Sequence, residues 1–446
     1  MSESLEASET RPSVQEVLDT EHNAVPRSLR ETRPADLGTA AIDTRRYTSR
    51  EHHDLEMERM WSRVWQMACR EEEIPNVGDH VLYEIGDTSL IIVRSAESTF
   101  KALHNSCLHR GMTLRARGGN THAFKCPFHG FTWNLDGTLK EIPCRWDFPQ
   151  VKDEEFCLPE ARVGRWGGFV FVNLDPECIP LEDYLGPIPE HFAPWRYEDR
   201  VQIAHVQKHI PANWKAVSEA FMESFHVRAT HPQIMPYLAD TNTQYDVYDD
   251  HVNRMISMML VPSPHVADKT SAQQSIDAVI GPGAISMPEG ETARRFMGEM
   301  WRSSLRESGY DASEATYSEL LDAIQYLVFP NFSPWGGYQR NIVYRFLPKG
   351  NDPDACIMEV RLLGLFGEGH APEPAKLRVL GPDEDIMTAT ELGPLCPIFK
   401  QDMANLPRVQ QGLRASRSRA VQLARRQEVR IRHFHRTLDK YLARES

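Results

Sequence analysis

A short stretch in the middle of the chain contains the residue types of a metal site. Glu219, Glu223 and His226 recur at i, i+4 and i+7, so on a helix they would form one polar stripe. His231 follows five residues after His226. On an unbroken helix this spacing would place the two rings roughly 140° apart, at about 100° per residue. Pro232 favours a helix end here, because the residue before a proline is pushed out of the α region. A helix that ends between the two histidines would let both face one ion.

A second group of ligand-type side chains lies earlier, in two short motifs. Cys107 and His109 form C-x-H, Cys126 and His129 form C-x-x-H, and 16 residues separate the motifs. Two thiolates and two imidazoles suit tetrahedral zinc. They suit equally a [2Fe–2S] cluster in which two histidines replace two cysteines on one iron. The spacing alone therefore leaves both metals open.

The residues that flank these motifs favour the iron–sulfur cluster. The tripeptide H-R-G and the octapeptide C-P-F-H-G-F-T-W resemble the two cluster-binding loops of Rieske proteins. Glycines in such loops let the backbone approach the sulfides and donate N–H bonds, which tune the reduction potential. We expect a Rieske [2Fe–2S] cluster bound by Cys107, His109, Cys126 and His129.

The elements before these motifs are predicted to be a helix and a small sheet. Apolar residues at helical spacing predict a helix from Ser49, its N-cap, to Trp65. Residues 81–85, 90–94 and 100–104 have strand composition with turn residues between them. An antiparallel sheet that leads directly into the cysteine motifs is the expected result.

The second half of the chain alternates between loop, helix and strand patterns. Residues 267–291, with the sequence G-P-G, predict a loop or lid. The remaining patterns predict helices over 292–308 and 313–328, paired strands over 341–347 and 356–366, and mostly helix over 398–444.

Taken in order, the motifs resemble the Rieske non-haem iron oxygenase large (alpha) subunit, the aromatic ring-hydroxylating dioxygenase family. N-W-K, E-A-F-M-E-S-F-H and T-H-P resemble its mononuclear iron motif, and F-K-Q-D-M-A-N-L-P-R, from Phe399, resembles the segment with the third ligand. The resemblance implies that His226, His231 and Asp402 hold Fe(II) as a two-histidine, one-carboxylate triad with open positions for dioxygen and substrate.

The resemblance also assigns a role to one glutamate and leaves another undecided. Glu223 takes the position of a carboxylate that links the two metal centres across a subunit boundary, here between His226 and His129 of the adjacent chain. Many members have asparagine where this chain has Ala220. Glu219 is either a group that supports the iron ligands or part of the polar stripe.

The fold implied is α+β, with a small all-β Rieske domain and a helix-grip catalytic domain whose antiparallel sheet surrounds a long helix. Composition and motif order predict four segments. These are a mobile N-terminal arm (1–45), a helix that packs on the catalytic domain (46–66), the Rieske domain (67–175) and the catalytic domain (176–446).

The activity implied is that of a terminal oxygenase that hydroxylates an aromatic or alicyclic compound with O2. Dihydroxylation, monooxygenation and oxidative demethylation all remain open, and Met222 and Phe225 are expected near the substrate. Electrons would come from NAD(P)H through a separate reductase, with or without a ferredoxin, because the chain lacks a G-x-G-x-x-G fingerprint. The resemblance implies a homotrimer with electron transfer between subunits, and a beta subunit is possible. A Rieske electron carrier with a non-catalytic binding domain is the alternative.

Composition and charge argue against several classes of protein. The formal net charge of -13 argues against a dedicated nucleic-acid binder. No apolar run approaches the roughly 20 residues that span a bilayer. The acidic, polar N-terminus does not resemble a signal peptide. We expect a cytoplasmic protein without a membrane segment.

Overall fold

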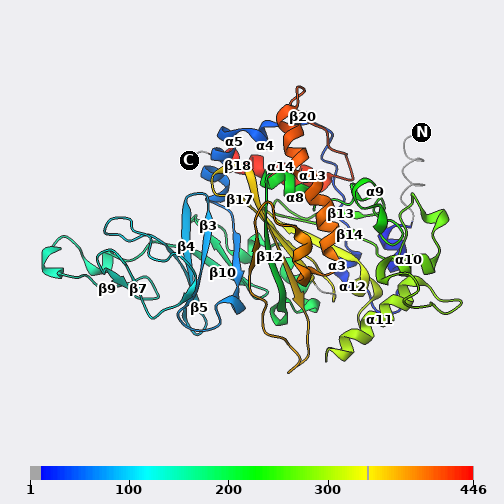
Figure 1. Ribbon diagram of the computed structural model, residues 1–446, viewed down its shortest axis with the longest axis horizontal. Helices are drawn as coiled ribbons and strands as arrows, with labels where there is room; N and C mark the ends of the chain where they lie inside the picture. Colours follow the sequence, from blue (N-terminus) through cyan, green and yellow to red (C-terminus); the bar gives the residue numbers. More distant parts are fainter. Residues whose placement is uncertain (1–11, 339–340, 445–446) are drawn as a thin grey trace. The chain divides into compact units, whose positions relative to one another are not determined.

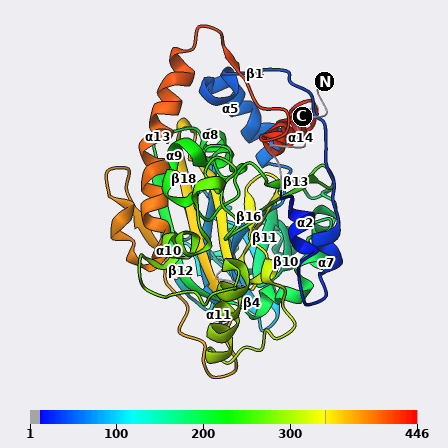
Figure 2. The ribbon, with the colours of Figure 1, turned by 90° about the vertical axis from the view of Figure 1, so that its right-hand side faces the viewer.

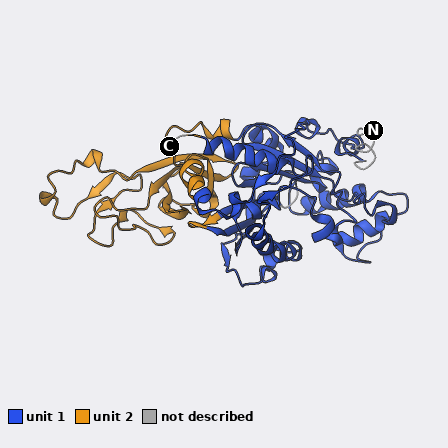
Figure 3. Ribbon diagram, turned by 90° about the horizontal axis from the view of Figure 1, so that it is seen from above, with its two compact units in different colours: residues 1–53, 185–347, 353–443 blue, residues 54–184, 348–352, 444–446 orange. Residues whose placement is uncertain are grey.

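The computed structural model describes residues 12–338 and 341–444. The first eleven residues of the predicted arm lie outside the described residues. The chain divides into two compact units (Figure 3). The larger unit comprises residues 1–53, 185–347 and 353–443, and the smaller unit comprises residues 54–184, 348–352 and 444–446. Among the described residues, no helix combines the length and the apolarity needed to cross a bilayer.

The smaller unit is built on a seven-stranded sheet in the order β2-β11-β10-β5-β4-β3-β6. The three predicted strands are present as β3 (Asp79–Ile85), β4 (Thr88–Ala96) and β5 (Thr99–His104), and they pair antiparallel as expected. The other strands are β2 (Gln66–Arg70), β6 (Gly119–Asn120), β10 (Glu160–Trp166) and β11 (Phe169–Asn173).

A second, three-stranded sheet of the smaller unit carries the later cysteine motif. It consists of β7 (Phe124–Lys125), β8 (Thr132–Trp133) and β9 (Leu139–Glu141). One apolar cluster joins side chains of both sheets and includes both cysteines of the two motifs; its buried members include Ile91, Val93, Leu103, Cys107, Phe124, Cys126 and Trp133. The two motifs therefore share one core.

The larger unit contains an eight-stranded sheet in the order β13-β14-β15-β16-β17-β18-β12-β19. Its strands are β12 (Val201–Ile210), β13 (Gln244–Val247), β14 (Val252–Ser257), β15 (Ala323–Val328), β16 (Phe332–Pro334), β17 (Asn341–Lys349), β18 (Asp352–Gly364) and β19 (Arg378–Leu380). The edge strand β19 runs parallel to β12, whereas β12 and β18 are antiparallel. The expected strands over 341–347 and 356–366 are thus β17 and β18.

Helices flank this sheet (Figures 1 and 2). They include α8 (Trp214–Glu219), α9 (Val227–Thr230), α10 (Ala272–Ile280), α11 (Ala293–Glu307), α12 (Tyr317–Leu321), α13 (Leu395–Ala415) and α14 (Val429–Leu442). The longest of these, α13, has 21 residues and packs against α8 and β12. It is the long helix that the family resemblance implied.

Two of three predictions from local pattern are wrong in part. The stretch 313–328 is helical only over α12, because the six buried residues of β15 pair with β14 and sheet pairing overrides the local pattern. The predicted loop 267–291 contains α10, whose N-cap Ser271 forms a capping box with Gln274. The prediction of mostly helix over 398–444 is confirmed by α13 and α14, between which β20 (Ala420–Val421) pairs with β1 (Ile42–Asp43).

The predicted helix from Ser49 to Trp65 is present but ends earlier, at Trp61. It comprises α5 (Arg50–Glu56) and a π-helical turn (Met57–Trp61), and the short helix α4 (Arg45–Thr48) precedes Ser49. The Ser49 hydroxyl accepts from the His52 N–H at 3.2 Å, so Ser49 does cap α5. The division between the two units falls after His53, inside α5.

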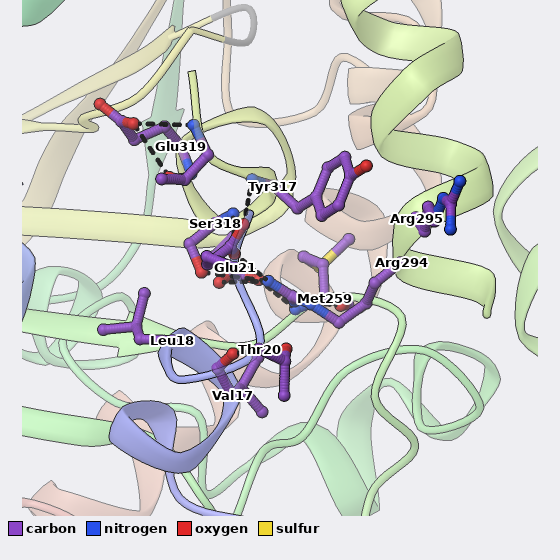
Figure 4. Close-up of polar contacts among 12 residues, drawn as sticks. Val17, Leu18, Thr20, Glu21, Met259, Arg294, Arg295, Tyr317, Ser318 and Glu319 are labelled. Atoms are coloured by element: carbon purple, nitrogen blue, oxygen red, sulfur yellow. Dashed lines mark hydrogen bonds and ion pairs between the residues drawn. The ribbon is translucent and has the colours of Figure 1, made fainter. Parts of the chain in front are cut away.

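Residues 12–45 differ from the mobile arm that their composition suggests. They contain α2 (Val14–Leu18) and α3 (Arg27–Arg30), and Leu18 and Leu29 are each only 1% exposed. The Glu21 carboxylate accepts from the first backbone N–H groups of α12, at 2.7 Å from Tyr317 and 2.9 Å from Ser318 (Figure 4). Buried leucines and a carboxylate at a helix start hold this segment on the larger unit.

Arg294, on α11, completes the attachment of this segment (Figure 4). Its guanidinium lies 2.6 Å from Asp322 and 3.7 Å from Glu21, and both carboxylates are almost fully buried. We expect Arg294→Met to lower the free energy of unfolding of the larger unit by about 3–5 kcal/mol, because it leaves buried anions without a partner. Denaturant unfolding, followed separately for the two units, measures this loss.

The neighbouring arginine provides a matched control. The Arg295 side chain is 55% exposed and lies 3.5 Å from Glu291. Arg295→Met should change the free energy of unfolding by no more than about 0.5 kcal/mol. Equal losses in the two variants would contradict the prediction.

Candidate metal centres

The stretch that contains both histidines folds differently from a single helix. α8 begins at its N-cap Asn213 and ends at Glu219, so Glu223 lies beyond the helix and the predicted polar stripe does not form. The buried Ser224 explains the break. Its hydroxyl is 2.6 Å from the Thr243 hydroxyl, and its N–H donates to the Tyr245 hydroxyl at 3.3 Å. These bonds to a distant segment replace the bonds of a continuing helix.

The short helix α9 then separates the two histidines. The His231 backbone has left the α region, with φ -126° and ψ 51°, immediately before Pro232. The helix end expected between the histidines is present, but it belongs to α9 and not to an extended α8.

The two histidines converge with a carboxylate from α13. One ligand-type atom from each of His226, His231 and Asp402 lies within 4.8 Å of the others. Asp402 Oδ1 is 2.9 Å from His231 Nε2 and 3.8 Å from His226 Nε2. His231 and Asp402 are buried, whereas the His226 side chain is 27% exposed. The structure thus brings together the three residues that the sequence singled out.

The far nitrogen of each imidazole faces an oxygen acceptor. His226 Nδ1 donates to Glu223 Oε1 at 2.6 Å, and the His226 backbone N–H donates to Oε2 at 3.0 Å. His231 Nδ1 donates to Gln401 Oε1 at 2.7 Å. With the protons on Nδ1, each Nε2 is left as the ligand atom. Two imidazoles and one carboxylate on one side of a site are a donor set that fits Fe(II).

The same contacts change the pKa of His226. Burial disfavours the charged imidazole, but the hydrogen bond and charge of Glu223, with a contribution from Asp402, raise the pKa of His226 above its ordinary value. The carboxylate groups around this imidazole therefore favour a positive charge at the position where a metal ion would lie.

Glu219 belongs to a different network. Among the described residues, its hydrogen bonds go to the Tyr47 hydroxyl, at 3.0 and 3.1 Å, and to His435 Nε2, at 2.8 Å. Burial and the nearby charge of Glu219 raise the pKa of Tyr47 well above its ordinary value, so the phenol remains protonated. Glu219 fastens the end of α8 to α4 and α14.

The two cysteine motifs form loops of the same design. The Gly111 N–H donates to the Cys107 carbonyl at 2.8 Å, and the Gly130 N–H donates to the Cys126 carbonyl at 3.1 Å. Both glycines have positive φ, 76° and 80°, a conformation that glycine adopts without strain. The loops therefore present their side chains in equivalent ways.

Each loop contains one thiol, which is buried, and one imidazole, which lies at the rim. Cys107 and Cys126 are 2% and 1% exposed, and burial together with the adjacent Cys126 raises the pKa of Cys107. The His109 and His129 rings lie 4.7 Å apart, and Phe131 stacks on His109 at 4.6 Å. Paired thiols in the core and paired imidazoles at the rim fit a cluster with one iron bound by cysteine and one by histidine.

Aromatic side chains approach Asp402 from the turn after α8, from β17 and from α13 itself. Phe221 and Tyr344 each lie 6.1 Å from Phe399, which is one turn before Asp402, and burial with the charge of Asp402 raises the pKa of Tyr344. Phe225, which was expected near the substrate, is 54% exposed, and Phe221 is the phenylalanine of this stretch that lies beside Tyr344 and Phe399.

Sequence reasoning missed Tyr344 and Gln401. Tyr344 lies in a continuous run of buried residues along β17, a pattern that indicates a buried strand but gives no sign of the metal site. Gln401 directly precedes Asp402, and this adjacency was its one available signal.

Comparisons with known proteins agree with this arrangement. The family described as "Ring hydroxylating alpha subunit (catalytic domain)" matches residues 190–444, and the "Rieske [2Fe-2S] domain" matches residues 64–152. The biphenyl 2,3-dioxygenase subunit alpha of Rhodococcus jostii is 31% identical over 207 residues, 45% of either chain. The anthranilate 1,2-dioxygenase large subunit of Acinetobacter baylyi is 33% identical over 207 residues, 45% of this chain and 44% of its own. The matched segments thus span less than half of these relatives.

Solved structures share the fold across most of the chain. The quaternary ammonium Rieske monooxygenase CntA, in complex with L-carnitine, has a TM-score of 0.65 at 17% identity, over 92% of this chain and 99% of its own. The naphthalene 1,2-dioxygenase from Rhodococcus sp., bound to indole, has a TM-score of 0.62 at 21% identity, over 91% and 95%. Because the catalytic-domain match alone spans more than half of the sequence, the chain belongs to the family of ring-hydroxylating oxygenase alpha subunits, with a Rieske domain ahead of its catalytic domain.

Proposed function

We propose that the protein is the terminal oxygenase of a Rieske oxygenase system, which uses O2 to oxygenate an organic substrate. The convergence of His226, His231 and Asp402 supports this proposal most directly, because their ligand-type atoms lie within 4.8 Å of one another. This donor set binds Fe(II) on one side and leaves other positions free. A bound iron would supply the site at which O2 and substrate meet.

The residues of the smaller unit would supply the electrons to this site. Cys107, His109, Cys126 and His129 would bind the [2Fe–2S] cluster, with the imidazoles at the rim. Glu223 would link His226 to His129 of an adjacent copy in a homotrimer. Each carboxylate oxygen can accept more than one hydrogen bond, so the bonds of Glu223 to His226 leave capacity for a second imidazole. A separate reductase, with or without a ferredoxin, would reduce the cluster.

The substrate would be an aromatic or alicyclic compound. Support comes from the aromatic side chains near Asp402, where Phe221 lies 5.0 Å from Tyr344 and 5.2 Å from Phe346. Such side chains bind apolar rings by burial and by offset or edge-on contacts. They would hold the substrate near the metal site and exclude water, whichever of dihydroxylation, monooxygenation or demethylation follows.

Iron content and turnover test this function together. The purified protein should contain about three irons per chain, because the cluster holds two. After chemical reduction it should convert at least one member of a panel of aromatic acids, polycyclic compounds and N-methyl or O-methyl compounds into an oxygenated product, with label from 18O2. About two irons per chain and no product would indicate an electron carrier with a binding domain. A colourless protein that contains zinc would overturn both readings.

A further inference from the structure

We propose that Gln401 is a positioning residue of the mononuclear metal site, which sets the tautomer of His231 and keeps the charge of the site balanced. The inference rests on the proposed function, since it concerns the same site. It assigns a role to a residue that neither the motif nor the three ligands identify. Helix α13 would then contribute both a ligand, Asp402, and the acceptor that orients a second ligand, His231.

The position of the Gln401 amide is fixed by two neighbours. Its Oε1 accepts from His231 Nδ1 at 2.7 Å and from Gln233 Nε2 at 2.7 Å. Its Nε2 donates to Gln233 Oε1 at 3.3 Å. The paired amides of Gln233 and Gln401 leave the oxygen of Gln401 directed at the imidazole.

This arrangement decides which nitrogen of His231 can bind a metal. An amide oxygen only accepts, so the proton of the neutral imidazole lies on Nδ1 and the lone pair lies on Nε2. Nε2 faces Asp402 Oδ1 at 2.9 Å, so these two atoms would both be available to hold a metal ion. With no acceptor at position 401, the proton could reside on Nε2 instead, and metal binding would have to displace it.

The two histidines differ in the charge of the group that accepts from Nδ1. His226 donates to a carboxylate, Glu223, and His231 donates to an amide, although both acceptors lie at nearly the same distance, 2.6 and 2.7 Å. Asp402 and Glu223 then provide two negative charges, which balance a divalent ion. A third carboxylate in place of Gln401 would increase the basicity of His231 and stabilise a trivalent ion relative to a divalent one.

Equilibrium binding of Co(II) to protein stripped of its mononuclear metal tests this role without any turnover. Visible absorption of Co(II) reports the ligand set, and the [2Fe–2S] spectrum reports whether the rest of the protein is intact. We expect Gln401→Leu to weaken Co(II) binding about 10- to 100-fold, which is the usual effect when a ligating histidine loses the group that accepts its hydrogen bond. Gln401→Glu retains the acceptor, so it should bind Co(II) at least as tightly as the parent. It should also lower the Fe(III)/Fe(II) midpoint potential.

Gln233→Leu is the matched control. Among the described residues, the Gln233 side chain forms hydrogen bonds with the Gln401 amide and none with the His231 imidazole. This variant should weaken Co(II) binding by less than Gln401→Leu does. Parent-like binding in Gln401→Leu, or a tenfold loss in Gln401→Glu, would overturn the proposal. If the parent protein itself binds no Co(II) at this site, the proposed metal site fails and not merely the role of Gln401. If Gln401→Leu does not fold, Gln401→Glu still decides through its affinity and its potential.

Discussion

The Glu223→Gln variant is expected to retain both metal centres and yet to turn over about 10- to 100-fold more slowly than the parent. Glutamine keeps one oxygen that can accept from His226 Nδ1. Its amide nitrogen, however, cannot accept from the His226 backbone N–H, which donates to the second carboxylate oxygen at 3.0 Å. The variant also loses the charge that makes the 2.6 Å bond to Nδ1 strong. Electron transfer that depends on the charged Glu223 carboxylate should therefore slow, while the residues that hold the two metal centres remain in place.

Rapid mixing of the reduced protein with O2 and substrate measures this effect. The absorbance of the [2Fe–2S] cluster reports its oxidation, and in Glu223→Gln this oxidation should slow as much as product formation does. Glu219→Gln is the matched control, because Glu219 lies four residues earlier and bonds to Tyr47 and His435. Parent-like cluster oxidation in Glu223→Gln would remove Glu223 from the proposed path.

Loss of Asp402, unlike the change at Glu223, should remove the mononuclear metal. In Asp402→Ala we expect about two irons per chain in place of about three, because the cluster keeps its own two irons and the mononuclear site loses its only charged ligand of the three. Product should fall below detection while the visible spectrum of the cluster is unchanged. Metal analysis, together with electron paramagnetic resonance of the reduced cluster, measures both centres in one sample.

Asp385→Ala controls for the loss of a carboxylate close to α13. Asp385 is 46% exposed and pairs with Lys400 on α13 at 2.6 Å, so its removal should leave about three irons. Retention of the third iron in Asp402→Ala would show that Asp402 is not a ligand, and the mononuclear site would have to be assigned again.

Short-range patterns predicted some elements well. Strands β3 to β5 follow from strand composition and from turn residues that are adjacent in the sequence, and α11 begins after Thr292 and ends at Glu307, close to the predicted 292–308. Such elements are determined mainly by their own residues, so the sequence is sufficient to place them.

Elements that depend on distant partners were not predictable in the same way. α8 ends early because Ser224 bonds to Thr243 and Tyr245, and no local signal at Ser224 indicates those partners. β15 is a strand because β14 pairs with it. In the site, the motifs pointed to the histidines and to Asp402, whereas the acceptor role of Gln401 became visible only when α13 was placed beside His231.

The network of Glu219, Tyr47 and His435 sets a limit on how far the chain can be shortened. A six-residue helix such as α8 is not stable in isolation, and its last residue is fastened by one side chain from α4 and one from α14. A chain shortened past Tyr47, or one that ends before His435, would lose more than a peripheral segment. It would release the end of α8, which leads into the segment with His226 and His231, so Tyr47 and His435 together support the candidate metal site from two remote parts of the chain.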